Sequence, residues 1–131
     1  MIFIDSNIPM YLVGVQHPNK IAARRALELC INQGERLVTS AGVLREILHR
    51  YAAIGRLDAI QPAFNALTDV VDEIFPIELA DVKGVKDVVL GGAKLSARDA
   101  LHVAVMKRRS IVRIMSFDSG FDGVQWVERV R

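Results

Sequence analysis

The sequence predicts an α/β fold, a single-domain three-layer sandwich in which helices flank a mostly parallel sheet. Short runs rich in β-branched and aromatic residues alternate with helical patterns along the chain. The stretches between these runs are long enough to hold helices, and parallel strands need such crossover connections. The length of 131 residues fits one domain with its own core, so we assign residues 1–131 to it.

Four segments are predicted as strands because each is a short apolar run that polar or turn residues end. They are residues 1–5, Arg36–Ser40, Ile74–Leu79 and Ser110–Ser116. Ile74–Leu79 is expected at an edge of the sheet, because Pro76 cannot donate a hydrogen bond to a neighbouring strand. A short terminal strand is expected around Trp126.

Five segments are predicted as helices because their apolar residues recur with helical spacing. They are Asn19–Asn32, Ala41–Ile54, Leu57–Val71, Leu79–Leu90 and Ala97–Arg109. The buried stripes are expected to include Ile21 and Leu29 in the first helix and Leu48 in the second, which Ser40 could cap. Pro62 either bends the third helix or marks its true first turn.

Composition restricts the class of protein more than its activity. Half of the chain is apolar (51%) and 24% is charged, as in a compact globular domain. A net charge of +2 is compatible with a nucleic-acid partner but is weak support for one. Cys30 is the only cysteine, which excludes an internal disulfide framework and favours a reducing cytoplasm. No apolar run is long enough to cross a bilayer.

Several acidic residues fall at one predicted edge of the sheet. Asp5 ends the first strand and Asp118 follows the strand Ser110–Ser116, so both should reach the edge formed by the carboxyl ends of parallel strands. Asp99 begins the helix that leads into that strand. Glu46 lies about one and a half turns inside the second helix, beside its buried stripe.

Each acid also has a purely structural interpretation. Ser96 and Asp99 have the spacing of a helix capping box, although Glu or Gln is the usual third residue. Asp5 and Asp118 could stabilise turns, and Glu46 could be a solvated helix acid paired with a basic neighbour. His102, one turn after Asp99, is expected to be a partly buried structural histidine.

Four carboxylates that meet at one edge would repel one another, and a divalent cation would offset that repulsion. Oxygen ligands without cysteine or a histidine pair favour Mg²⁺ or Mn²⁺ over zinc. One or two such ions could activate water for attack on a phosphodiester, which would leave a 5′-phosphate and a 3′-hydroxyl.

The ordered set of motifs resembles PIN-domain ribonucleases, especially the VapC-type toxins of toxin–antitoxin pairs. The motifs are DSN at Asp5, a helical Glu46, LSARDALHVAVM with Asp99 and SFDSGFD with Asp118. The resemblance covers essentially the whole chain, and LSARDALH is its most specific part.

The resemblance implies roles for particular residues. Asp5, Glu46, Asp99 and Asp118 would form the acidic quartet that holds Mg²⁺ or Mn²⁺. Supporting polar groups would come from Asn7 and Ser116, and the late acid could instead be Asp122, although Asp118 lies closer to the strand end.

The preference for RNA over DNA also comes from the resemblance, because an activated water does not need a 2′-hydroxyl. Candidates for contacts with the RNA backbone are Arg45, Arg50, Lys94 and Arg98, any of which could simply be solvated. The family resemblance further implies a homodimer and a VapB-like antitoxin that covers the active edge.

The main alternative function is a noncatalytic domain, either a PIN-like RNA-binding scaffold or a metal-bound regulatory module. A receiver domain fits poorly, since the first strand ends in one acid and Arg36–Ser40 ends without any. Trp126, Tyr11 and Tyr51 are isolated aromatics in the sequence, so no stacking pattern of the RNA-recognition-motif kind is expected.

Overall fold

The computed structural model describes residues 1–131 and contains one five-stranded sheet of order β3-β2-β1-β4-β5. All four neighbouring pairs of strands are parallel. The strands are β1 (Ile2–Ile4), β2 (Leu37–Ser40), β3 (Glu73–Phe75), β4 (Arg113–Met115) and β5 (Glu128–Val130). The predicted α/β sandwich with a mostly parallel sheet is therefore confirmed.

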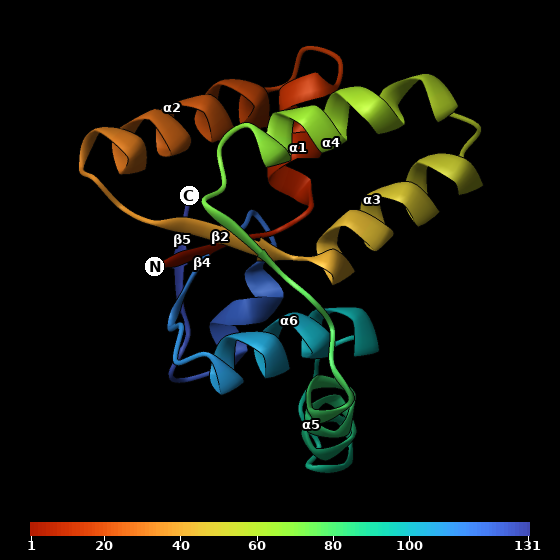
Figure 1. Cartoon of the computed structure of the whole chain (residues 1–131), viewed down its shortest axis with the longest axis vertical. Helices are drawn as coiled ribbons and strands as arrows, with labels where there is room; N and C mark the ends of the chain where they lie inside the picture. Colours follow the sequence, from red (N-terminus) through yellow and green to blue (C-terminus); the bar gives the residue numbers. More distant parts are fainter.

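Six α-helices surround the sheet. They are α1 (Asn7–Val13), α2 (Pro18–Asn32), α3 (Ala41–Ala53), α4 (Ile60–Thr68), α5 (Leu79–Leu90) and α6 (Ala97–Arg108), with short 3₁₀ helices at Leu57–Ala59 and Ser119–Gly123. Figure 1 shows α1, α2 and α4 on one side of the sheet and α5 and α6 on the other, while α3 continues from the carboxyl end of β2. This arrangement gives the three layers. No helix combines the length and the apolarity that a membrane span needs.

The central strand β1 positions the functional edge. Its residues are completely buried, as expected for a parallel strand covered on both faces. β1 pairs with β4 from Ile2↔Arg113 to Ile4↔Met115, and with β2 through Phe3↔Val38. Because these strands run in the same direction and in step, Asp5 and Ser116 leave the sheet side by side.

The two edges of the sheet are short strands. β3 ends at Phe75, immediately before Pro76, and lies at one edge as predicted. β5 forms the other edge, and it begins two residues after Trp126, so the expected terminal strand is present with a slightly later start. Pro62 is the third residue of α4, which confirms that it marks the first turn and does not bend the helix.

One helix, α1, was not predicted, and the buried face of the next helix was predicted wrongly. α1 has only seven residues with Pro9 inside it, so the segment shows no repeated apolar period and its DSN start resembles a turn. α2 packs against α1, and its buried face contains Ala23 and Leu27. The predicted burial of Ile21 and Leu29 is wrong, since they are 50% and 58% exposed.

Helix α3 begins as predicted but buries a different set of side chains. Ser40 caps it, because its hydroxyl accepts a hydrogen bond from the Gly42 N–H at 3.2 Å. Leu48 is exposed, contrary to expectation, while Glu46 is buried. The side of α3 that turns toward the carboxyl edge of the sheet thus carries the acid Glu46, while Leu48 faces away from it.

Candidate active site

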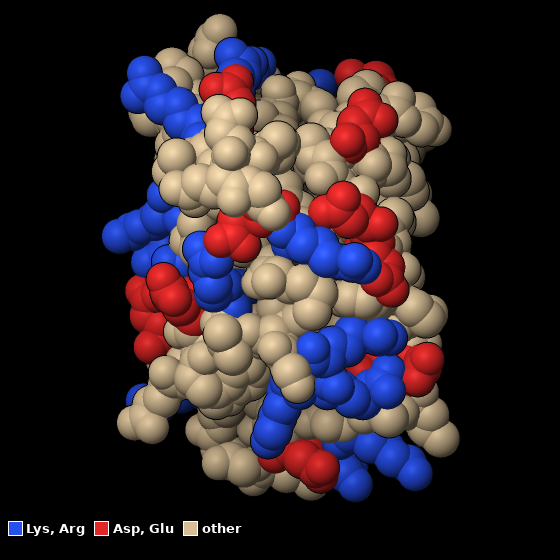
Figure 2. Space-filling view, turned by 60° about the vertical axis from the view of Figure 1, so that its left-hand side comes forward, with Lys and Arg blue, Asp and Glu red and all other residues tan.

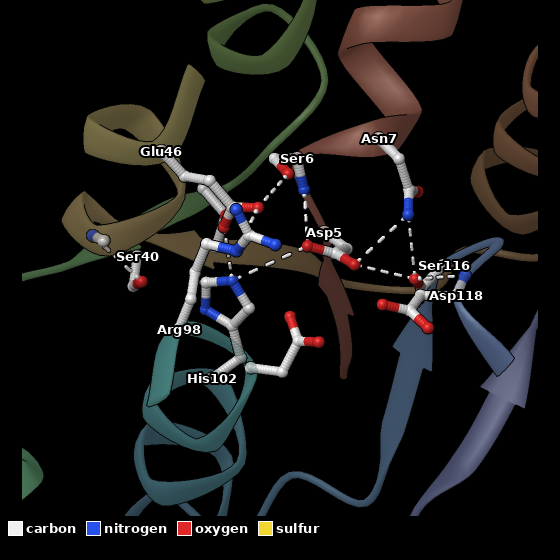
Figure 3. Close-up of polar contacts among 12 residues, drawn as sticks. Asp5, Ser6, Asn7, Ser40, Glu46, Arg98, His102, Ser116 and Asp118 are labelled. Carbon is white, nitrogen blue, oxygen red and sulfur yellow. Dashed lines mark hydrogen bonds and ion pairs between the residues drawn. The ribbon is translucent and has the colours of Figure 1, made fainter. Parts of the chain in front are cut away.

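The four predicted acids line a single cleft of about 330 Å³ at the carboxyl edge of the sheet. Asp5 follows β1, Glu46 lies on α3, Asp99 is in the first turn of α6, and Asp118 follows β4. Figure 3 shows the side chains of Asp5, Glu46 and Asp118, which come from three of these elements, gathered at this edge. Segments that are far apart in the sequence therefore supply one concentrated group of carboxylates.

Asp5 is the buried centre of this group. Its Oδ1 accepts a hydrogen bond from the Ser6 N–H at 2.7 Å, and its Oδ2 accepts one from the Ser116 hydroxyl at 2.7 Å. Burial raises the pKa of Asp5, and the nearby His102 and the Ser116 hydrogen bond only partly oppose that rise. The carboxyl group is thus held in place but is not fully compensated for the loss of water.

The predicted supporting residues, Asn7 and Ser116, connect α1 to the loop after β4. The Asn7 Nδ2 donates to the Ser116 Oγ at 3.1 Å and to the Asp5 Oδ2 at 3.3 Å. The Phe117 N–H donates to the Asn7 Oδ1 at 3.3 Å, and the Asp118 N–H donates to the Ser116 Oγ at 3.0 Å. The loop that carries Asp118 is therefore fixed relative to Asp5 (Figure 3).

Glu46 is bound by three side chains of the protein. Its Oε1 accepts a hydrogen bond from the Ser6 hydroxyl at 2.8 Å and lies 3.3 Å from the Arg98 Nε, while its Oε2 is 2.9 Å from the His102 Nε2. Burial alone would raise the pKa of Glu46, but these hydrogen bonds and the charges of His102 and Arg98 outweigh it and lower that pKa. Glu46 is consequently an internally neutralised carboxylate.

His102 has a larger part in the site than the sequence indicated. It is completely buried, not partly buried as expected, and its Nε2 also lies 3.6 Å from the Asp5 Oδ1. Burial disfavours its charged form, yet the hydrogen bond to Glu46 and the charge of Asp5 raise its pKa. The available signal was the DALH spacing, which puts His102 on the same side of α6 as Asp99.

Asp99 takes part in capping α6 through its backbone N–H, while its carboxyl group faces the cleft. The Ser96 hydroxyl accepts a hydrogen bond from the Asp99 N–H at 3.1 Å, which caps α6. The Asp99 carboxyl does not return a bond to the Ser96 N–H, so the capping box is incomplete. Burial and the charges of Asp5 and Asp118 instead raise the pKa of Asp99 to about 6. Its side chain thus belongs to the acidic group.

The structure separates the two candidates for the late acid. Asp118 lines the cleft, and its Oδ1 accepts a hydrogen bond from the Gly120 N–H at 2.8 Å. Asp122 forms an ion pair with Arg129 at 2.8 Å and does not line the cleft. The geometry therefore favours Asp118.

The four predicted RNA-contacting residues do not lie together. Arg50 and Arg98 line the cleft, whereas Arg45 and Lys94 do not. Ser6, which the sequence analysis did not single out, joins the first strand to α3 through Glu46. No sequence pattern marks that contact, because its two partners are 40 residues apart.

The donor set fits a hard divalent cation. Ligand atoms of Asp5, Glu46 and His102 lie within 4.8 Å of one another, but the His102 nitrogen is already bonded to Glu46. The pKa values of Asp5 and Asp99 are raised, first by burial and then by neighbouring carboxylates, so the protein does not fully compensate the charge of either group. A cation that prefers oxygen ligands would relieve that repulsion at Asp5, Asp99 and Asp118.

Comparison with known proteins agrees with this geometry. The family model described as PIN domain matches residues 2–127. The chain belongs to the PIN domain family. This PIN domain is 58% identical to ribonuclease VapC13 of Mycobacterium tuberculosis over 130 residues, which is 99% of each chain.

Solved structures share the PIN domain fold over the full chain. A crystal structure of VapC20 of Mycobacterium tuberculosis, described as a toxin that cleaves the sarcin–ricin loop, has a TM-score of 0.81 at 22% identity and 100% coverage of both chains. A toxin–antitoxin complex from Klebsiella pneumoniae has a TM-score of 0.67 at 16% identity, covering 98% of this chain and 96% of that one.

Proposed function

We propose that this PIN domain is an endoribonuclease that depends on Mg²⁺ or Mn²⁺ and acts as the toxin of a toxin–antitoxin pair. The observation that carries the proposal is the convergence of Asp5, Glu46, Asp99 and Asp118 in one cleft. The ribonuclease name of the relative that is 58% identical supports RNA as the substrate. A noncatalytic scaffold would not need carboxylates kept close together at an electrostatic cost.

The residues of the cleft would have different roles in binding the cation and the RNA. Asp5, Asp99 and Asp118 would hold the cation, while Glu46 stays bound to Ser6, Arg98 and His102. When bound, a divalent cation supplies positive charge to a phosphodiester oxygen and lowers the pKa of a water molecule. Arg50, which also lines the cleft, would bind a neighbouring phosphate of the RNA.

We propose that water, and not the ribose 2′-hydroxyl, is the nucleophile. The His102 ring is completely buried and its Nε2 faces Glu46, so it is not accessible to a ribose 2′-hydroxyl. The His17 Nδ1 accepts the Asn19 N–H at 3.0 Å and is therefore not free to act as a base, and the Nε2 of the neutral ring then carries the proton. Attack by water leaves a 5′-phosphate and a 3′-hydroxyl.

A nuclease assay on mixed RNA with Mg²⁺ or Mn²⁺ tests this function. Wild-type protein and Asp122→Asn should cut RNA, while Asp5→Ala and Asp99→Asn should lose activity. EDTA should stop cleavage, and the products should carry 5′-phosphates. Equal background activity in all four proteins would refute the nuclease function, and 2′,3′-cyclic phosphate ends would refute water as the nucleophile.

We further propose a homodimer, a cytoplasmic location and an antitoxin partner. Large apolar side chains stand exposed outside the cleft, among them Ile54, Leu57, Leu79 and Leu90, and such surface is available for subunit contacts. The single cysteine, Cys30, is free and buried, as suits a reducing compartment. A protein of the same fold was solved as a toxin–antitoxin complex, which supports the antitoxin partner.

Light scattering tests the homodimer. It should give a dimer mass at micromolar concentration, and a monomer mass would contradict the proposed homodimer.

A further inference from the structure

One wall of the cleft is aromatic and has no part in the chemistry described above. Tyr11, on α1, and His17, the N-cap of α2, line the cleft together with Met10 and Val15. The ring centroids of Tyr11 and His17 lie 5.0 Å apart with 34° between the ring planes. Tyr11 also meets Phe117 edge to face at 5.3 Å. We call Phe117, Tyr11 and His17 the aromatic row.

Hydrogen bonds within the protein hold both ends of the aromatic row, and the Phe117 end adjoins the acidic group. Phe117 lies directly before Asp118, and its N–H donates to the Asn7 Oδ1 at 3.3 Å. At the other end, the His17 Nδ1 accepts the Asn19 N–H at 3.0 Å, which fixes the ring and leaves the proton of a neutral ring on Nε2. The rings are therefore held in a set position relative to the carboxylates before any ligand binds.

The row is only partly covered by the protein. Phe117 and Tyr11 are half-buried, whereas His17 is exposed and its neighbour Val15 is 81% exposed. Capping α2 does not require an aromatic ring, because Ser, Thr, Asp and Asn are the residues that N-caps prefer. The imidazole at this position consequently presents aromatic surface at the mouth of the cleft, where core packing does not use it.

We propose that the aromatic row is a subsite for one unpaired nucleobase next to the scissile phosphate of the RNA. The inference rests on the proposed ribonuclease function and names the class of substrate, an RNA with a single-stranded segment. Bases that are free of a duplex stack on Tyr, Phe and His rings, and this is the usual means of recognising RNA loops.

The shape and charge of the cleft agree with a nucleotide as the occupant. The same cleft is lined by Tyr11 and His17 of the row, by the carboxylates and by the two arginines Arg50 and Arg98, so base, phosphate and reacting groups would share one space. Its volume of about 330 Å³ is at the lower end of small-ligand pockets, which suits a splayed-out nucleotide and not a helical duplex.

The variant His17→Asn removes the ring that would stack on a base without removing the cap of α2. Asparagine keeps an acceptor for the Asn19 N–H and is a preferred N-cap, so α2 should stay intact while the ring is lost. His49→Asn is the matched control, because His49 is an exposed histidine on α3 that does not line the cleft. Tyr11→Leu removes the second ring and keeps apolar bulk.

Cleavage of an RNA that the wild type cuts is then compared with cleavage of the same RNA carrying an abasic nucleotide on either side of the cut. Wild type and His49→Asn should lose roughly 5- to 150-fold in kcat/KM at one of the two positions. His17→Asn and Tyr11→Leu should already be slow on the intact RNA and should lose much less. An equal abasic effect in all four proteins would overturn the subsite.

Binding without cleavage separates this inference from the proposed function. In the Asp99→Asn background, single-stranded RNA with 2-aminopurine beside the cut position should show fluorescence quenching that His17→Asn abolishes. Quenching without any cleavage by wild type would refute the nuclease and keep the subsite. Unchanged quenching in His17→Asn would refute the subsite. A His17→Asn protein that cuts RNA normally but no longer binds its antitoxin would also refute it, and would assign the rings to the contact with the protein partner.

Discussion

Asp99 and Glu46 show that acids in one cleft can be treated differently by their surroundings. Glu46 has hydrogen bonds and basic neighbours that outweigh burial and lower its pKa, whereas burial and the charges of Asp5 and Asp118 raise the pKa of Asp99 to about 6. The protein thus neutralises one carboxylate itself and leaves the others with unfavourable charge. Cation binding is expected where that charge remains.

Asp99→Asn should stabilise the metal-free protein while it removes activity. Because the folded pKa of Asp99 lies above the unfolded value of 3.8, this group destabilises the metal-free fold increasingly as the pH rises from about 4 to 6. The penalty at pH 7.5 is at most about 3 kcal/mol. Melting in EDTA should show a higher Tm for the variant at pH 7.5 and no difference at pH 4. A lower Tm of Asp99→Asn than of wild type at pH 7.5 would contradict an unfavourable ionisation of Asp99 in the fold.

His102→Ala should destabilise the protein by about 2–4 kcal/mol, because it leaves the buried Glu46 Oε2 without a partner and opens a cavity. His102→Gln offers an amide donor near the position of the lost Nε2 and should recover part of that loss. Urea denaturation in EDTA measures both variants. Equal stability of His102→Ala and wild type would show that the contact between His102 and Glu46 does not stabilise the fold.

Sequence reasoning could place the acids but not their partners. Asp5 and Asp118 follow strands, so parallel topology alone brings them to one edge. The contacts of His102 with Glu46 depend on how α3 and α6 cross, and helical periodicity does not contain that information. Hydrogen bonds such as that from Ser6 to Glu46 join residues with no sequence relation.

Helices α5 and α6 form a packed pair on one face of the sheet, and one ion pair joins them. The Arg108 Nε of α6 donates to the buried Asp81 Oδ1 of α5 at 2.7 Å, and the Asp81 Oδ2 accepts the Glu78 N–H at 2.9 Å. Burial would raise the pKa of Asp81, but these bonds lower it. The pair stabilises the helix that carries Asp99 and His102.

Asp81→Asn should cost about 1.5–3 kcal/mol at pH 7. The folded pKa of Asp81 lies below the unfolded value of 3.8, so its contribution is complete above that pH and is lost as the pH falls through the folded value. Urea denaturation from pH 7 to 3 should therefore show a difference that shrinks toward pH 3. Asp87→Asn, an exposed acid on the same helix, should change little at any pH. A difference for Asp81→Asn that stayed constant with pH would exclude the ionised pair as its source.

The predicted strands and helices are present, but their bounds differ from the prediction and the short helix α1 was missed. The predicted helix Leu57–Val71 is a 3₁₀ turn followed by α4, which ends at Thr68, and the predicted strand Ile74–Leu79 is replaced by β3, which ends at Phe75 before Pro76. The seven-residue α1 has too few turns for a period to show. Its omission also hid the aromatic row, since Tyr11 meets His17 and Phe117 only through the packing of α1.

At the scale of the whole molecule, the distribution of charge provides little electrostatic attraction for RNA. The net charge is +2, and Figure 2 shows basic and acidic side chains interspersed over the face in view. Attraction for RNA would therefore depend on a few arginines at the cleft and not on a broad basic surface.

Arg50→Ala should weaken RNA binding and reduce the slope of log Kobs against log salt by about 0.7, the effect of one phosphate contact on a single strand. Arg45→Ala is the control, because Arg45 lies on the same helix but does not line the cleft. Fluorescence titrations in the Asp99→Asn background measure both slopes. A slope change of the same size for Arg45→Ala would show that the cleft has no special role.

The proposed function requires that Asp5, Asp99 and Asp118 together bind a divalent cation. Calorimetric titration of the metal-free protein with Mn²⁺ tests it most directly, with Asp118→Asn and Asp122→Asn compared at one pH above 7. We predict Mn²⁺ binding by wild type and Asp122→Asn and strongly weakened binding by Asp118→Asn. No Mn²⁺ uptake by the wild type, or the same affinity in all three proteins, would contradict the claim.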